Sequence, residues 1–160
     1  MLRGLTLALF LLLGAAALAD AGEDCDKGSG DIAIGGCTEL IRRNPRNTSA
    51  YYNRGVEYIA KGDLDRAIAD YTKAIEIDPK FAMAYNNRGD TWRIKGENDR
   101  AIADLNKAIE LNPKFAMAYN NRGNAYKAKG DLDRSIADYT KSHRDRSEIR
   151  HGLRQPWRRL

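Results

Sequence analysis

The chain has 160 residues and a formal net charge of +5, with 42% hydrophobic and 31% charged residues. Basic and acidic side chains are equal in number between Asp20 and Lys141, so the positive excess lies at the two ends of the chain. Without a basic stripe on its body, the protein is not expected to bind nucleic acid.

Residues 1–19 have the pattern of an export signal. Arg3 precedes an apolar run from Leu5 to Leu18, and Ala17-Leu18-Ala19 provides the small residues that signal peptidases select. The run is shorter than the roughly twenty residues of a membrane-spanning helix, although an uncleaved membrane anchor is the alternative. We expect cleavage after Ala19, or after Ala21, and a mature protein in a bacterial periplasm or outside the cell.

Internal repetition dominates the rest of the chain. The stretch PKFAMAYNNRG occurs at 79–89 and again at 113–123, a spacing of 34 residues that also relates many prolines, tyrosines and glycines. In YYNRGVEYIAKG and DRAIADYTKAIEIDP, apolar residues recur every three or four positions, which predicts one helix in each stretch. Glycines 62, 96 and 130 end the first helix of each unit, and a proline follows the second helix at 79 and 113.

These marks resemble the tetratricopeptide repeat (TPR) family. The family's aromatic, glycine, aromatic, small, aromatic, alanine and proline positions are matched by Tyr51, Gly55, Tyr58, Ala67, Tyr71, Ala74 and Pro79. The next unit supplies Tyr85, Gly89, Trp92, Ala101, Leu105, Ala108 and Pro113. The resemblance implies an all-α, right-handed α-solenoid of helix-turn-helix hairpins. Its repeats are expected at 48–81, 82–115 and, truncated, 116–141.

Residues 20–47 are expected to form an N-terminal half-repeat that caps the array. DIAIGGCTELIRRNP at 31–45 aligns with the second helix of the later units, but residues 20–30 are too rich in glycine to predict a first helix. In an oxidising compartment Cys25 and Cys37 predict a disulfide, with free thiols as the alternative. A zinc site is not expected, since the two histidines lie far away in the tail.

The repeat pattern stops after Lys141, and residues 142–160 are expected to form a disordered basic tail. Codons exist for every tail residue such that a reading shifted by one base gives AIEIDPKFAMAYDNRGDA, the expected continuation of the repeat. We therefore interpret the tail as the product of a frameshift. A solvated tail and an anchor for an anionic surface are the alternatives. Fraying of the last helix, incomplete cover of Ile136 and Tyr139, and self-association through the open end would follow.

The resemblance also implies where a ligand would bind, because the first helix of each hairpin lines the inner groove in this family. The residues expected there are Asn53, Val56, Met83, Asn87, Asp90, Met117, Asn121 and Asn124, with Lys127 as the one plausible clamp lysine. Asn53, Asn87 and Asn121 would form a ladder of amides similar to that of the O-linked sugar transferases, which holds a peptide main chain. Alternatively, each amide caps or solvates its own helix. Asn86 and Asn120 are expected to be solvated.

Arginines at 54, 88 and 122 replace the leucine usual in the family, and each has an aspartate sixteen residues later. Ion pairs within each repeat are expected, with ligand binding as the alternative. No cofactor or metal motif and no recognisable nucleophile–base pair was found, so an enzyme is not expected. We predict a non-catalytic adaptor that binds an extended segment of another protein. A self-stacking assembly protein and a fragment without present function are the alternatives.

Overall fold

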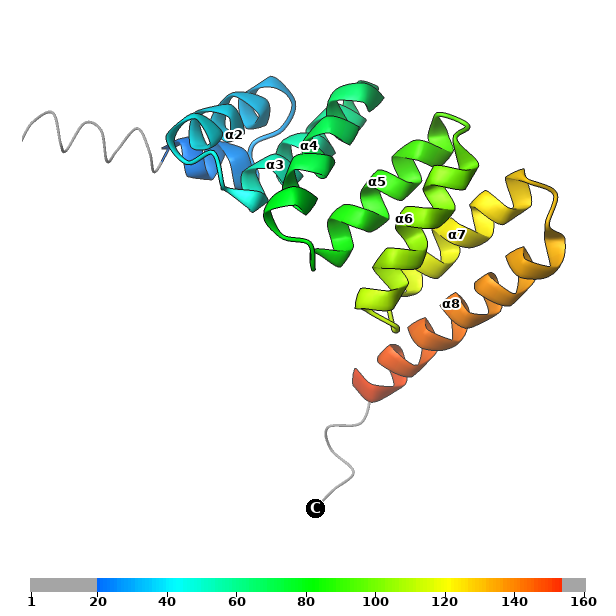
Figure 1. The fold of residues 1–160 in the computed structure, drawn as a ribbon. Helices are drawn as coiled ribbons and strands as arrows, with labels where there is room; N and C mark the ends of the chain where they lie inside the picture. The colour runs from blue at the N-terminus through cyan, green and yellow to red at the C-terminus, as the bar shows by residue number, and fades with distance from the viewer. Residues whose placement is uncertain (1–19, 154–160) are drawn as a thin grey trace, which may run out of the picture. The chain divides into compact units, whose positions relative to one another are not determined.

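The computed structural model describes the backbone of residues 20–153 and the side chains of residues 20–145 (Figure 1). Within this range every regular element is a helix. They are the segment 20–27, α2 (Asp31–Arg43), α3 (Thr48–Ala60), α4 (Leu64–Ile77), α5 (Ala82–Ile94), α6 (Asn98–Leu111), α7 (Ala116–Ala128) and α8 (Leu132–Leu153). The all-α class and the succession of helical hairpins are as predicted. The expected signal peptide, 1–19, lies outside the described residues.

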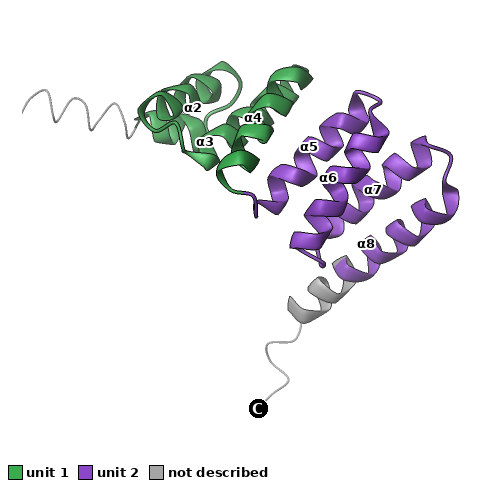
Figure 2. Cartoon of the chain, viewed as in Figure 1, with its two compact units in different colours: residues 1–78 green, residues 79–160 purple. Residues whose placement is uncertain are grey.

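The chain divides into two compact units, residues 1–78 and 79–160 (Figure 2). The described part of the first unit holds the segment 20–27 and α2 to α4, and that of the second holds α5 to α8. The hairpins α3–α4 and α5–α6 coincide with the predicted repeats 48–81 and 82–115. None of the helices in the described range has the length and apolar character needed to cross a bilayer.

Each hairpin turns at a glycine, as the sequence predicted. Gly62, Gly96 and Gly130 have φ of 76°, 83° and 80°, a left-handed conformation that side chains with a Cβ adopt at a cost. The following helix is then capped in two of the three hairpins. Asp63 accepts a hydrogen bond from the Arg66 backbone N–H at 3.1 Å, and Asp131 accepts one from the Arg134 N–H at 3.1 Å.

Small residues let the two helices of a hairpin cross closely. A Cβ added to Gly89 in α5 would lie 2.8 Å from the Leu105 Cγ and 3.1 Å from the Ala101 carbonyl oxygen in α6. The core of the second unit follows from this crossing. Ala101, Leu105 and Ala108 of α6 are fully buried in one apolar cluster with Ala118 and Ala125 of α7, so α7 covers the open side of the preceding hairpin.

The first unit differs from the prediction at its start, because residues 20–27 are helical and complete a hairpin with α2. The interpretation of 20–47 as a half-repeat was wrong. Two of the glycines that argued against a helix, Gly28 and Gly30, belong to the turn, where Gly30 has φ of 59°. Gly36 of α2 faces the segment so closely that an added Cβ would lie 2.7 Å from the Ala21 carbonyl oxygen.

The predicted disulfide holds this first hairpin together. Cys25 of the segment 20–27 and Cys37 of α2 are bonded, and both are buried in a cluster with Ala50 of α3. Hydrogen bonds also join the hairpin to α3. Glu57 accepts from the Gly30 backbone N–H at 2.7 Å, and Asn53 donates from its Nδ2 to Asp26 at 3.0 Å. The N-terminal end of the array is thus closed by a covalently fixed helix pair.

The end of α8 also differs from the prediction. The helix continues to Leu153, whereas the sequence predicted that the repeat pattern, and with it the regular helix, would stop after Lys141. No glycine or proline interrupts the sequence between Ser142 and His151, so nothing in it stops a helix that is already nucleated. Ser142 is buried and donates its hydroxyl to the Ala116 carbonyl oxygen at 2.8 Å, which fixes the next turn of α8 against α7.

Candidate functional site

A stripe of side chains on α5 and a second on α7 form the candidate site. Met83, Asn87 and Asp90 lie on one face of α5 because they are four and three residues apart, and Met117, Asn121 and Asn124 repeat that spacing on α7. The two helices lie side by side in the second unit (Figure 1). We call these six residues, together with Ile94, the α5/α7 surface.

The apolar members of the α5/α7 surface are exposed. Met83 and Met117 have 48% and 55% of their surface accessible, and Ile94 has 49%. Sequence reasoning missed Ile94, although its position four residues after Asp90 continues the same stripe. Large apolar side chains that neighbours in the chain leave uncovered are typical of a binding surface when they gather on one face.

A buried amide joins the two stripes. Asn86 is only 1% exposed, donates from Nδ2 to the Asn87 Oδ1 at 3.0 Å, and accepts from the Asn121 Nδ2 at 3.1 Å. The expectation that Asn86 is solvated was therefore wrong, because α7 packs over it. Its counterpart Asn120 is half-buried. The ladder members Asn87 and Asn121 are brought together through Asn86, the third amide.

The hydrogen bonds on α7 leave defined polar atoms exposed to a ligand. Asn121 uses its Nδ2 on Asn86, and its Oδ1 accepts no hydrogen bond within the described part of the chain. Asn124 accepts from the Tyr139 hydroxyl at 2.7 Å through Oδ1, while its Nδ2 donates to none of the described residues. An acceptor and a donor thus stand one turn apart on the same helix face.

The remaining residues predicted for the site differ in their surroundings. Asp90 forms an ion pair with Arg93 at 2.8 Å. Lys127 is exposed on α7, three residues after Asn124 and beside the stripe rather than in it. Asn53 and Val56 belong to the first unit, where Val56 is exposed and Asn53 is bonded to Asp26. Asn53 is therefore engaged by the disulfide-held hairpin.

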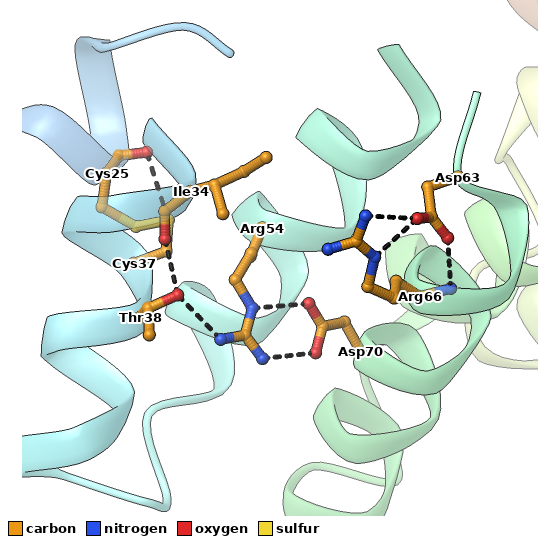
Figure 3. A network of polar contacts seen from close by, with 8 residues as sticks. All are labelled: Cys25, Ile34, Cys37, Thr38, Arg54, Asp63, Arg66 and Asp70. Atoms are coloured by element: carbon orange, nitrogen blue, oxygen red, sulfur yellow. Dashed lines mark hydrogen bonds and ion pairs between the residues drawn. A yellow bond between two sulfur atoms is a disulfide. The ribbon is translucent and has the colours of Figure 1, made fainter. Parts of the chain in front are cut away.

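The predicted ion pairs are present in all three repeats, and each is a two-pronged contact. Arg54 donates through Nε and Nη2 to the two carboxylate oxygens of Asp70, both at 2.8 Å (Figure 3). The equivalent pairs are Arg88 with Asp104 and Arg122 with Asp138, at 2.7 to 2.8 Å. The guanidinium groups also lie over Tyr51, Tyr85 and Tyr119 at 5.5 to 5.7 Å from the ring centres.

These ion pairs join the two helices of each hairpin and are not part of the α5/α7 surface. The hydrogen bonds that Arg54 donates to Asp70 raise the pKa of Arg54, and those that Arg122 donates to Asp138 raise the pKa of Arg122. Arg54 also donates to the Thr38 hydroxyl at 3.0 Å, which links α3 to α2 (Figure 3). Because both partners are largely buried, each guanidinium is already neutralised inside the fold.

Comparisons with known proteins agree with this arrangement of helical hairpins. Three family models match, described as a tetratricopeptide repeat at 48–81 and 70–103 and as a TPR repeat at 89–130. Together they span more than half of the chain. No curated protein matches the sequence.

Among solved structures, the chain is similar to MamA, with 26% identity and a TM-score of 0.76 over 84% of this chain and 79% of that one. It is similar to TTC0263, a thermophilic TPR protein in Thermus thermophilus, with 25% identity and a TM-score of 0.65 over 72% and 64% of the two chains. A third similar structure is the first TPR of Spaghetti (RPAP3) bound to the HSP90 peptide SRMEEVD, with 28% identity and a TM-score of 0.61 over 62% and 79%. From its repeats, its hairpins and these matches, the chain belongs to the tetratricopeptide repeat family.

Proposed function

We propose that the protein is a non-catalytic adaptor, and that the α5/α7 surface binds an extended segment of another protein. The observation that carries the proposal is the pair Asn121 and Asn124, which follows the exposed Met117 on one face of α7. An extended main chain presents N–H and C=O groups in alternation, and the Asn121 Oδ1 and the Asn124 Nδ2 match one of each.

The apolar part of the surface complements this polar pair. Met83 and Met117 are exposed, unbranched and polarisable, so they can adapt to side chains of different shape. Two structures similar to this chain, the first and second TPR of Spaghetti (RPAP3), are bound to an HSP90 peptide, which supports a peptide as ligand. The HSP90 peptide is not proposed as the ligand of this chain, because Lys127, beside the stripe, is the one candidate for a clamp lysine on α7.

Affinity for a single short peptide should be modest. Binding fixes the peptide backbone and several long side chains, which costs about 0.5–1.5 kcal/mol for each immobilised side chain. Few polar contacts offset that cost, so dissociation constants in the micromolar range, about 8 kcal/mol of binding free energy, are expected.

The proposal is tested by panning a library of displayed twelve-residue peptides on the full chain and measuring the selected peptides by fluorescence anisotropy. Met117→Glu places a charge on the exposed apolar stripe, and Asn124→Asp keeps the acceptor for Tyr139 while removing the Nδ2 donor. Each change should weaken binding about tenfold or more. Ala103→Glu, on an exposed position of α6, is the control and should bind as the wild type does. Selected peptides that bind all four proteins equally would contradict the proposal.

We also propose that the adaptor works in the periplasm or outside the cell. A disulfide between Cys25 and Cys37 is typical of oxidising compartments and supports this location. The experiment is fractionation of the native host, followed by N-terminal sequencing of the mature protein. A first residue of Asp20 or Gly22 in the exported fraction is expected, whereas an intact leader in the cytoplasm would refute the location.

A further inference from the structure

The last helix of the second unit, α8, exposes a face whose equivalent on α6 is covered by α7. We call Leu132, Ile136, Tyr139, Thr140 and His143 of α8 the end face. Each lies 34 residues after a residue of α6. Of those α6 residues, Ile102, Leu105 and Ile109 pack in one cluster with Ala118 and Ala125 of α7, and Asn106 accepts a hydrogen bond from Arg122 of α7. The two helices can be compared directly because both belong to the second unit.

The comparison shows what cover is missing. Ile102 of α6 is half-buried, whereas Ile136 is 62% exposed. Leu105 is fully buried, whereas Tyr139 is only half-buried. Ile109 is half-buried, whereas His143 is exposed. At Leu132, the side chain is 59% exposed where Asn98 is half-buried. All four differences have the same sign, so the end face is the α6 face without its α7.

The end face also borders a hollow in the protein surface. Tyr139, Thr140 and His143 line an open hollow of about 600 Å³ with Arg144. On α6, the corresponding surface is filled by α7, whose Ala118 and Ala125 are fully buried in the same cluster as Ala101, Leu105 and Ala108. Small residues at these two positions let the helix axes approach, and Phe115 packs beside them.

We propose that the end face binds, in trans, the first helix of a tetratricopeptide hairpin from another polypeptide. The chain itself specifies the ligand chemistry, because its own α7 already occupies the equivalent face of α6. The ligand is a helix with alanine at both crossing positions and an aromatic residue just before its first turn. This site is distinct from the α5/α7 surface and takes a helix rather than an extended segment.

The test uses a synthetic peptide with the sequence of residues 113–130, PKFAMAYNNRGNAYKAKG, labelled at its N-terminus and titrated with the full chain. Anisotropy should show saturable one-to-one binding. Far-UV circular dichroism should show a gain of helix on mixing, because a peptide of this length is barely helical alone. A peptide carrying Ala118→Glu and Ala125→Glu should bind at least tenfold more weakly.

Two matched variants of α8 locate the site. Ile136→Glu changes an exposed residue of the end face and should weaken binding at least tenfold while leaving the unfolding temperature unchanged. Ala137→Glu should bind as the wild type does, because its counterpart Ala103 stays exposed even where α7 covers α6. Met117→Glu should also leave binding unchanged, which separates this site from the proposed peptide surface.

Three outcomes would overturn the proposal. The first is the absence of saturable binding up to millimolar peptide, and the second is equal binding to the wild type and to Ile136→Glu. The third is a dimer, seen by light scattering, that Ile136→Glu dissociates and that the peptide does not compete with. In that case a second copy of the chain, rather than a helix from another polypeptide, occupies the end face.

Discussion

At the scale of single residues, replacing a glycine by alanine should change stability in opposite directions in two helices. Gly89→Ala should destabilise the protein by about 1–3 kcal/mol, because the new Cβ would lie within 2.8 Å of Leu105 in a packed core. Gly35→Ala should stabilise it by about 0.5–1 kcal/mol, because this α2 position has nothing within 4 Å and alanine favours the helix. Urea unfolding of both variants measures the difference. Equal changes in unfolding free energy would show that helix propensity, and not the distance between crossing helices, determines the effect of both substitutions.

Residue-level predictions from the sequence succeeded where both partners repeat. Each arginine–aspartate pair was predictable because residues of opposite charge recur at a constant spacing of sixteen residues in every hairpin. The burial of Asn86 was not predictable. Its neighbour in the sequence, Asn87, has the same amide group, and only the packing of α7 over α5 decides which of the two is enclosed.

At the scale of elements, the disulfide decides whether the N-terminal segment stays in place. A helix of eight residues is too short to persist alone, and the bond between Cys25 and Cys37 closes a loop whose loss costs about 3 kcal/mol. Reduction, or the double change Cys25→Ser and Cys37→Ser, should therefore raise hydrogen exchange in residues 20–27 and free Asn53 from Asp26.

The measurement is amide hydrogen exchange followed by mass spectrometry, with and without reductant. Helix α7 supplies the internal control, since the second unit contains no cysteine, and its exchange should not change. Unaltered protection of residues 20–27 after reduction would show that packing against α2, at Gly36, holds the segment without the bond.

The C-terminal half of α2 should make stability depend on pH. Side-chain hydrogen bonds from Arg42 and then Arg43 lower the pKa of Glu39 from 4.5 to about 2. Because the folded-state pKa lies below the unfolded one, this carboxylate stabilises the fold above pH 4.5 and the contribution disappears as the pH falls towards 2. Glu39→Gln should thus be less stable than the wild type at pH 7 and equally stable near pH 2. A difference in unfolding free energy that is constant with pH would contradict this assignment.

At the scale of the whole molecule, the sequence predicted the hairpins because 34-residue repetition leaves few alternatives. Thirteen- and fourteen-residue helices separated by left-handed glycines recur at the expected positions. The two differences between the predicted and the observed helices lie where repetition ends. Residues 20–27 have no second copy to compare with, and their helix depends on a covalent bond. In residues 142–153 a helix continues simply because no residue interrupts it.

The origin of residues 142–160 can be decided from the gene, and the structure predicts the consequence of restoring the other frame. We expect codons that, shifted by one base after Lys141, encode AIEIDPKFAMAYDNRGDA. The chain made in that frame supplies the helix that α8 lacks, so Ile136, now 62% exposed, becomes buried. Burying such a side chain contributes about 1.5–3 kcal/mol, and in a domain of this size each kcal/mol raises Tm by about 2–4 °C. The restored chain should therefore melt several degrees higher, and the same chain carrying Ile136→Glu should lose most of that gain. Codons that do not permit the shifted reading would refute the frameshift, and an unchanged Tm would show that the end face needs no cover.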